Sequence, residues 1–310
     1  MRVAIIGQQD FGKAALEAFL GRGDDVAAVF CAPEKPGARI DALKAAAQER
    51  NVPVLQFASL RRPEAHEAMT SLKADLAIMA YVLQFAPDSL VSIPRLGTIQ
   101  YHPSLLPKYR GPSSINWPII RGDHRTGLTI FRPTEGLDEG PVVLQKECAI
   151  GPDDTLGDVY FTRLFPMGVE ALLEASSLVV AGKHRETVQD ESQASYEGWC
   201  REAEARVHWG HHVDAVYNLI RGCNPAPGGW TTFDGKKLEL YDARKHAFRR
   251  FADVVGKIGE VSDVTETSFK ITAQGGRIEV LRARAADGKK ASGGEVARAL
   301  GLTAGTILGQ

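Results

Sequence analysis

Short apolar runs alternate with amphipathic stretches over the first hundred residues of the chain. Residues 3–6 form an apolar run that ends at Gly7, and the helical pattern of residues 13–20 follows after a short loop. The same order then repeats, and it predicts strands at 26–30, 52–55, 75–80 and 97–101, with a helix at 41–50. Strands that alternate with helices are typical of a parallel α/β sheet.

The later part of the chain has a different pattern. Residues 141–145 predict one more strand, residues 153–182 are mainly helical, and residues 183–195 are polar without periodicity. A helix is predicted at 211–221, and short alternating runs at 238–241, 268–271 and 278–281 are typical of a small antiparallel barrel. We therefore predict an α/β domain over 1–182, a linker over 183–204 and a barrel domain over 205–310.

Composition narrows the class of protein. A chain of 310 residues with 44% hydrophobic residues can fold into two domains, and its formal net charge of −1 gives no overall attraction to nucleic acid or anionic lipid. Its four cysteines contain no CxxC pair, so neither a zinc site nor a disulfide framework is indicated. The apolar run at the start is too short for a signal peptide, and no run reaches the roughly 18 residues of a membrane span. We predict a soluble, cytoplasmic protein with reduced cysteines and no metal.

The loop at residues 7–12 follows the first strand and opens a helix, a position where backbone N–H groups can face an anion. It begins and ends with glycine but lacks the middle glycine of the GxGxxG dinucleotide fingerprint. The pattern favours a tight structural turn and leaves an NAD-dependent dehydrogenase as an alternative.

A histidine stands where the fifth predicted strand ends. Residues i and i+2 of a strand share a face, so Gln100 and His102 are expected to point the same way, and Pro103 ends the strand behind them. The carboxyl edge of an open α/β sheet is the usual place for a site. Taken alone, His102 could serve either structure or catalysis.

A second polar cluster lies in the glycine-flanked loop at residues 136–140. It carries Asp138 and Glu139, and its glycines allow close backbone approach to a ligand. An aspartate here could orient a histidine or hold a water, and the alternative is a solvated turn.

Together these segments resemble the formyltransferase family that uses 10-formyltetrahydrofolate. That family includes methionyl-tRNA formyltransferase, glycinamide ribonucleotide formyltransferase and the hydrolase domain of 10-formyltetrahydrofolate dehydrogenase, which this chain resembles most. The resemblance rests on segments spread over almost the whole chain, namely residues 6–8, 11–12, 101–107, 110–111, 115–117, 136–138, 144–148, 196–198, 220–222 and 228–230. It implies a Rossmann-like catalytic domain over 1–182 and an OB-like C-terminal barrel.

The resemblance also implies roles for the candidate residues. His102 matches the general acid/base and Asp138 its essential partner, which also contacts the folate. Gln84, Phe85 and Ala86 match the loop that holds the pterin, and Ser104, Leu105, Leu106 and Pro107 match the folate-binding tetrapeptide. Attack on a formyl carbon places negative charge on the formyl oxygen and requires a proton for the leaving nitrogen, and an imidazole beside a carboxylate suits that proton transfer. The implied formyl donor is 10-formyltetrahydrofolate, and the implied product is tetrahydrofolate.

One position departs from the family. The tRNA and glycinamide ribonucleotide formyltransferases have asparagine two residues before the histidine, and the hydrolase domain has an aliphatic residue, whereas this chain has Gln100. Glutamine keeps the carboxamide N–H that can bind an oxyanion, on a stem that is one methylene longer. We therefore assign Gln100 a catalytic role.

The acceptor is indicated by a second departure. Residues 32–41 are short and mixed in charge, whereas tRNA formyltransferases have a longer basic loop there, and phosphate contacts need several Lys and Arg side chains. We therefore expect a small-molecule amine acceptor and no tRNA. The alternatives are hydrolysis to formate and tetrahydrofolate, methionyl-tRNA as acceptor, and a non-catalytic folate-binding module. The carrier and aldehyde-dehydrogenase domains of the dehydrogenase do not follow Gln310, so we expect no oxidation of the formyl group.

Overall fold

The computed structural model describes residues 1–250, 253 and 255–310. The chain forms two compact units. The first consists of Met1–Gly111, Gly127–Cys148 and Arg163–Tyr196, and the second of Pro112–Thr126, Ala149–Thr162 and Glu197–Gln310. Residues 183–196 of the predicted linker thus lie within the first unit.

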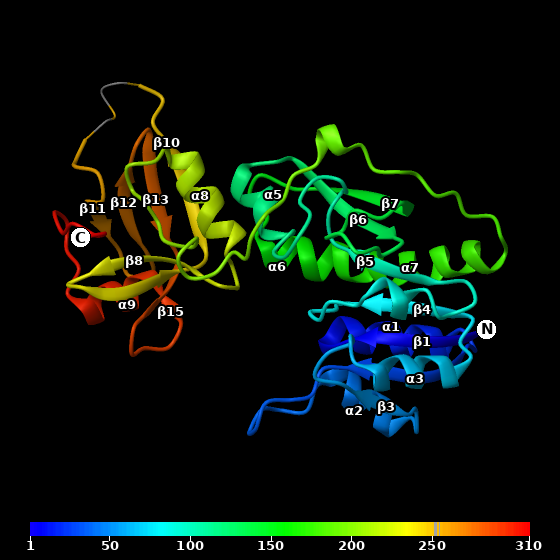
Figure 1. Ribbon diagram of the computed structural model, residues 1–310. Coiled ribbons are helices and arrows are strands. Elements are labelled where there is room, and N and C mark those ends of the chain that lie inside the picture. The colour runs from blue at the N-terminus through cyan, green and yellow to red at the C-terminus, as the bar shows by residue number, and fades with distance from the viewer. Residues whose placement is uncertain (251–252, 254) are drawn as a thin grey trace. The chain divides into compact units, whose positions relative to one another are not determined.

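A seven-stranded sheet forms the centre of the first unit, in the order β3-β2-β1-β4-β5-β6-β7 (Figure 1). Its strands are β1 Arg2–Gly7, β2 Asp25–Cys31, β3 Val54–Gln56, β4 Leu76–Ala80, β5 Thr98–His102, β6 Arg125–Phe131 and β7 Val142–Ala149. The first five are parallel as predicted. The predicted parallel sheet is confirmed in part, because the sheet is mixed: β6, for which no strand was predicted, runs antiparallel to β5. A parallel return needs a long crossover, usually a helix laid on the sheet, whereas an antiparallel return does not.

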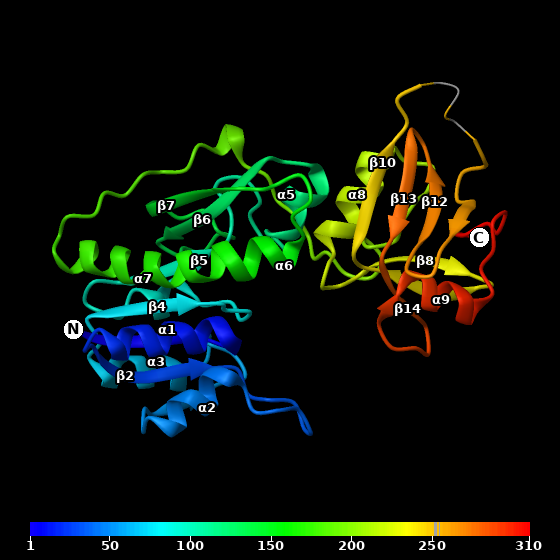
Figure 2. The same cartoon turned by 180° about the vertical axis from the view of Figure 1, so that it is seen from behind.

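Helices cover both faces of this sheet. On one face α1 (Gln9–Gly21) packs against α7 (Phe165–Val180) (Figure 2). On this face Phe11 of α1 stacks on Tyr101 of β5, with ring centroids 4.2 Å apart. Helix α2 (Ala42–Glu49) packs beside α1. On the other face α3 (Pro63–Leu72) and α4 (Asp88–Val91) bury their apolar side chains against alternate residues of the strands, such as Ala4 and Ile6. Burial on both faces explains why these strands are continuously apolar in sequence.

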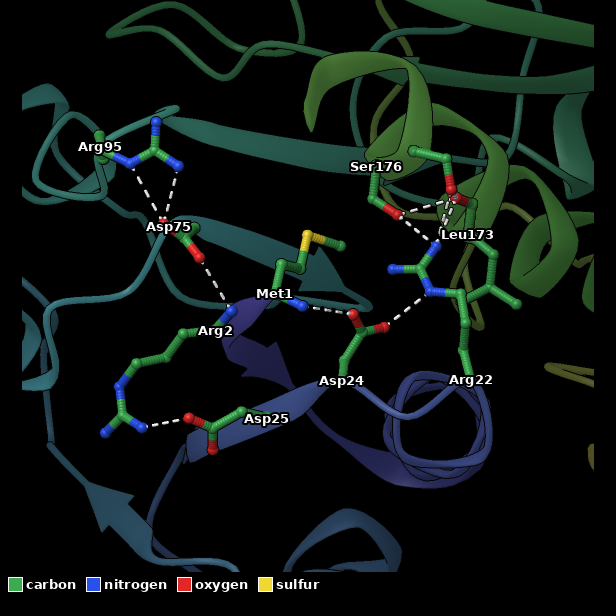
Figure 3. A network of polar contacts seen from close by, with 10 residues as sticks. Met1, Arg2, Arg22, Asp24, Asp25, Asp75, Arg95, Leu173 and Ser176 are labelled. Carbon is green, nitrogen blue, oxygen red and sulfur yellow. Dashed lines mark hydrogen bonds and ion pairs between the residues drawn. The ribbon is translucent and has the colours of Figure 1, made fainter. Parts of the chain in front are cut away.

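Ion pairs join the strands at their amino ends (Figure 3). The amino group of Met1 lies 3.2 Å from Asp24, which also accepts a 2.7 Å hydrogen bond from Arg22. Arg95 pairs with Asp75 at 2.8 Å. At the amino edge of the sheet the charged side chains thus pair with one another. The candidate site lies at the opposite, carboxyl edge.

The second unit contains two four-stranded antiparallel sheets, in the orders β10-β13-β12-β11 and β15-β14-β9-β8. Their strands are β8 Gly229–Phe233, β9 Lys236–Leu240, β10 Ala243–Ala247, β11 Val261–Val264, β12 Phe269–Ala273, β13 Gly276–Val280, β14 Arg282–Ala285 and β15 Ala291–Ser292. The unit also holds the helices α5 Asn116–Arg121, α6 Leu156–Val159, α8 Val213–Gly222 and α9 Gly293–Leu300. The predicted antiparallel strands are confirmed, and their closure into an OB-like barrel remains a prediction.

The described residues also include the π-helix Tyr160–Leu164 and the 3₁₀ turn Glu191–Gln193. Among the helices of the described residues, none is both long enough and apolar enough to cross a membrane.

Candidate active site

His102 is the last residue of β5, at the carboxyl edge of the first unit's sheet. Its side chain is only 7% exposed, and its Nε2 lies 2.8 Å from the carbonyl oxygen of Tyr109. A carbonyl can only accept, so Nε2 carries the hydrogen, and the neutral ring keeps its lone pair on Nδ1. The fold thus leaves one ring nitrogen available for proton exchange.

Asp138 faces that nitrogen. Its Oδ2 lies 3.5 Å from His102 Nδ1 and accepts a 2.8 Å hydrogen bond from the backbone N–H of Gly111. The carboxylate is therefore placed to accept a hydrogen bond when Nδ1 is protonated, and 3.5 Å is long enough that a small movement is needed to make that bond.

An unusual backbone conformation directs the Asp138 side chain. Asp138 has a φ of +54°, in the left-handed region that non-glycine residues adopt infrequently, asparagine and aspartate more often than most. Two residues later the loop passes so close to the residue after β6 that a Cβ on Gly140 would lie 1.6 Å from the carbonyl oxygen of Arg132. The glycines of the motif thus serve the close turn that brings Asp138 to His102.

Gln100 lies on the same face of β5 as His102, as the strand alternation predicts. Its neighbour in register on β4 is Met79, which belongs to the core beneath α3 and α4. The side chain is half-buried, and across residues 1–250, 253 and 255–310 its carboxamide has no hydrogen-bond partner. It is available to a ligand.

The predicted pterin loop lies between β4 and α4. Gln84 donates from Nε2 to the carbonyl oxygens of Phe57, at 2.9 Å, and Ala58, at 3.1 Å, so its side chain ties this loop to the one after β3. Phe85 is 42% exposed, and Ala86 is buried in the core below. Two of the three predicted residues thus shape the loop, and Phe85 is the one that offers an open surface.

The predicted folate tetrapeptide is held by its backbone. Thr129 donates to the carbonyl oxygen of Ser104 at 2.7 Å, and Gln145 donates to that of Leu106 at 2.9 Å. The side chains of Ser104 and Leu106 are buried, while Leu105 and Pro107 are partly exposed. A ligand at this segment would therefore meet mainly backbone and the latter two side chains.

The opening of α1 is closed to an anion. Asp41 accepts from the backbone N–H of Gln9 with both carboxylate oxygens, at 3.0 and 2.9 Å, so a negative charge already occupies the helix N-terminus. A Cβ on Gly7 would lie 2.2 Å from the carbonyl oxygen of Ala80. These contacts explain the glycine as a packing requirement and give no support to the dinucleotide alternative.

Sequence reasoning gave no role to Tyr109 or to Gln189, which the structure places at the site. The Tyr109 carbonyl fixes the ring of His102, and Gln189 Nε2 donates to the Asp138 carbonyl at 2.8 Å. Gln189 lies in a polar stretch without periodicity, where no local signal marks it. The described residues contain no group of three or more His, Cys, Asp or Glu side chains that could hold a metal.

Known proteins are similar to this chain along most of its length. The chain matches the family model described as formyl transferase over residues 1–175 and the one described as formyl transferase, C-terminal domain, over residues 200–301. It is 38% identical over 246 residues to the mitochondrial 10-formyltetrahydrofolate dehydrogenase of Mus musculus, covering 78% of this chain and 26% of that protein. The chain thus spans about a quarter of the dehydrogenase's length. It is 33% identical over 312 residues to the methionyl-tRNA formyltransferase of Syntrophus aciditrophicus (strain SB), covering 99% of this chain and 98% of the other.

Solved structures are similar in fold. HypX from Aquifex aeolicus in complex with tetrahydrofolic acid superposes with a TM-score of 0.66 at 19% identity, over 97% of this chain and 47% of that one. An N-formyltransferase from Helicobacter canadensis, in complex with folinic acid and dTDP-3-aminofucose, gives a TM-score of 0.66 at 17% identity, over 90% of this chain and 98% of that one. The two family models together span most of the sequence, and the chain therefore belongs to the formyl transferase family of enzymes.

Proposed function

We propose that this chain transfers the formyl group of 10-formyltetrahydrofolate to a small-molecule amine, as a cytoplasmic enzyme of one-carbon metabolism. The observation that carries the proposal is the pairing of His102 Nδ1 with Asp138, while Nε2 is committed to the carbonyl of Tyr109. A histidine fixed in this way can exchange a proton at one nitrogen only, which suits it to a single acid/base role.

The reaction moves one formyl group and one proton. The amine nitrogen forms a bond to the formyl carbon, the bond from that carbon to N10 breaks, and N10 gains the proton that the amine loses. His102 carries the proton between the two nitrogens, and Asp138 stabilises the imidazolium that exists in between. Gln100 donates from its unpartnered carboxamide to the charge that develops on the formyl oxygen.

The residues at the carboxyl edge of the sheet fit a folate as formyl donor. Exposed apolar side chains lie on both loops of this edge, Leu83 and Phe85 on the predicted pterin loop and Leu137 on the loop that carries Asp138. Burial raises the pKa of Tyr81, so its phenol stays protonated and can donate a hydrogen bond. Both solved relatives named above contain a folate, and one also contains an amino sugar, which supports a donor and an acceptor of these classes.

Turnover assays with three acceptors test the proposal. The protein is incubated with 10-formyltetrahydrofolate and either water alone, a panel of small amines including amino sugars, or methionyl-tRNA, and tetrahydrofolate is followed by absorbance. The proposal expects turnover that depends on an amine of the panel and a formylated amine in the mass spectrum.

Two relatives define the competing outcomes. Similarity to the dehydrogenases favours hydrolysis, which would give tetrahydrofolate and formate with water alone. Similarity to the tRNA enzyme over the full length of both chains favours methionyl-tRNA as acceptor. Either result would replace the small amine, and absence of turnover in all three arms would reject formyl transfer itself.

A further inference from the structure

The segment 187–196 contacts two parts of the candidate site, the loop that carries Asp138 and the stretch 109–110 beside His102. At one end Thr187 pairs with Val142, with N–H···O distances of 2.8 and 2.9 Å in the two directions. At the other end the Ser195 carbonyl accepts from the Arg110 backbone N–H at 2.9 Å, and the Ser195 hydroxyl accepts from the Tyr109 N–H at 2.8 Å. A stretch that reads as a linker in the sequence is thus anchored within the first unit.

Gln189 lies in the middle of this segment with its side chain pointing inward, 6% exposed. Its Nε2 donates to the backbone carbonyls of Asp138 and Gly140, both at 2.8 Å. Its Oε1 accepts from Arg110, at 3.1 Å from Nε and 2.8 Å from Nη2. Both donors and both lone pairs of the carboxamide are therefore used.

Arg110 is the residue that donates to the side-chain oxygen of Gln189. Its side chain is fully buried and forms an ion pair with Glu191 at 2.6 Å, which raises the pKa of the guanidinium. In the chain it stands between Tyr109, whose carbonyl accepts from His102, and Gly111, whose N–H donates to Asp138. One carboxamide thus joins the backbone of Asp138 to the short segment that holds His102.

We propose that Gln189 is a positioning residue, which holds the Asp138 backbone in its left-handed conformation and so keeps the carboxylate facing His102 Nδ1. The loop needs such support because its conformation is unfavourable for a non-glycine residue and its flanking glycines supply no side-chain packing. The inference rests on the proposed function, since it assumes that the His102–Asp138 pair carries the proton.

Two substitutions separate the hydrogen bonds of Gln189 to the Asp138 loop from the contacts of Arg110. Gln189→Glu keeps an oxygen for Arg110 but removes both donors to the Asp138 loop, whereas Glu191→Gln weakens the ion pair of Arg110 and leaves the donors in place. We expect Gln189→Glu to lower kcat by about 10- to 100-fold, the effect of misplacing a reacting group by about 1 Å. KM for the folate and the dissociation constant for tetrahydrofolate are expected to stay within about threefold, and Glu191→Gln to keep kcat within about threefold, as expected when the reacting geometry is unchanged.

Two controls complete the experiment. Gln48→Glu, on the exposed side of α2, adds the same charge away from the site. If Gln189→Glu fails to fold by circular dichroism, Gln189→Met, of similar size and without hydrogen bonds, takes its place with the same expectation. A folded Gln189 variant with the kcat of the wild-type enzyme overturns the positioning role. A loss of kcat in Glu191→Gln as large as that in the Gln189 variant also overturns it. Failure of the wild-type enzyme to turn over 10-formyltetrahydrofolate would instead reject the proposed function.

Discussion

His102 has its two ring nitrogens in different surroundings, and this asymmetry leads to the first prediction. His102→Ala and Asp138→Ala are each expected to abolish proton transfer and lower kcat by about 10²- to 10⁴-fold. Because both side chains are under a tenth exposed, replacement by alanine also disturbs packing. Asp138→Asn is therefore the more specific test. It keeps one oxygen for the Gly111 N–H and replaces the charged carboxylate by a neutral amide of the same size. Turnover is measured with 10-formyltetrahydrofolate, and a variant that keeps more than about a tenth of wild-type activity would contradict the assigned roles.

Gln100 leads to the second prediction. If its carboxamide stabilises the formyl oxyanion, Gln100→Ile should lower amine formylation by about 10²- to 10³-fold, the range for removing one oxyanion donor. Folate binding should barely change, because the predicted pterin loop lies elsewhere. A loss confined to the transition state appears in kcat and not in KM.

Gln100→Asn tests the reach of the same group. Activity that survives in this variant means that the shorter carboxamide also reaches the formyl oxygen. If Gln100→Ile transfers the formyl group as fast as the wild-type chain, Gln100 is a packing residue of β5.

The sequence indicated some residues of the candidate site and not others, for physical reasons. His102 and Gln100 lie at a strand end, and their common face follows from the two-residue repeat of a strand. Asp138 was predicted from the resemblance to the family, because a glycine-flanked loop with a carboxylate also fits a solvated turn. Gln189 and Tyr109 act through hydrogen bonds to backbone atoms that are distant in sequence or on irregular backbone, and such contacts leave no periodic pattern. A buried polar residue in a stretch without periodicity is visible only in three dimensions.

At the scale of elements, a buried carboxylate joins β9 and β14 of the second unit. Glu239 is 7% exposed and lies opposite Arg284 in register, with further hydrogen bonds from Tyr241 and Lys237. Burial alone would raise the pKa of Glu239, but the hydrogen bonds from Arg284, Tyr241 and Lys237 outweigh it and lower the pKa to about 2.

The third prediction follows from this depressed pKa. The unfolded chain takes up the proton near pH 4.5, so Glu239 stabilises the fold above that pH, and the contribution disappears as the pH falls toward 2. Arg284→Met is expected to lower the free energy of unfolding at pH 7 and to lower it much less near pH 2, where Glu239 is becoming protonated. Urea unfolding at a series of pH values measures this. Equal losses at pH 7 and at pH 2 would show that Arg284 acts through packing alone.

One strand shows why an element can be missed. Strand β6 was not predicted, and its sequence contains Gly127, which ordinarily weakens a strand. In the structure a Cβ at this position would lie 2.1 Å from the carbonyl oxygen of Lys146 on β7. The glycine is thus required by the close approach of the neighbouring strand, and that approach is a tertiary contact. The five parallel strands were predictable because burial on both faces makes each a continuous apolar run.

For the whole molecule, charge is unevenly divided along the sequence. Residues 1–196 contain 20 Lys and Arg against 24 Asp and Glu, a net of −4, whereas residues 197–310 contain 17 against 14, a net of +3. In the second unit the edge strand β10 exposes Arg244, Lys245 and His246. Two of these are already paired, Lys245 with Asp214 and His246 with Glu279. Local positive charge is therefore present but partly neutralised.

The fourth prediction concerns nucleic acid. The loop after β2 contains two cations, Lys35 and Arg39, and its Glu34 pairs with Lys44 of α2 at 2.9 Å, so few cations face a phosphate backbone there. Because binding to nucleic acid depends on releasing counterions from several phosphates, we expect tRNA binding only at low salt, with affinity falling steeply between about 50 and 200 mM salt. Methionyl-tRNA should not be formylated near 150 mM salt at low enzyme concentration, a condition under which surface charges are screened beyond about 8 Å. Filter binding across a salt series measures the first expectation, and acid gels of the aminoacyl-tRNA measure the second. Formyl-methionyl-tRNA formed at catalytic enzyme concentrations would make tRNA the acceptor, and the charge reversal Arg244→Glu, at an exposed cation of β10, would then be expected to weaken that activity by reducing phosphate contacts.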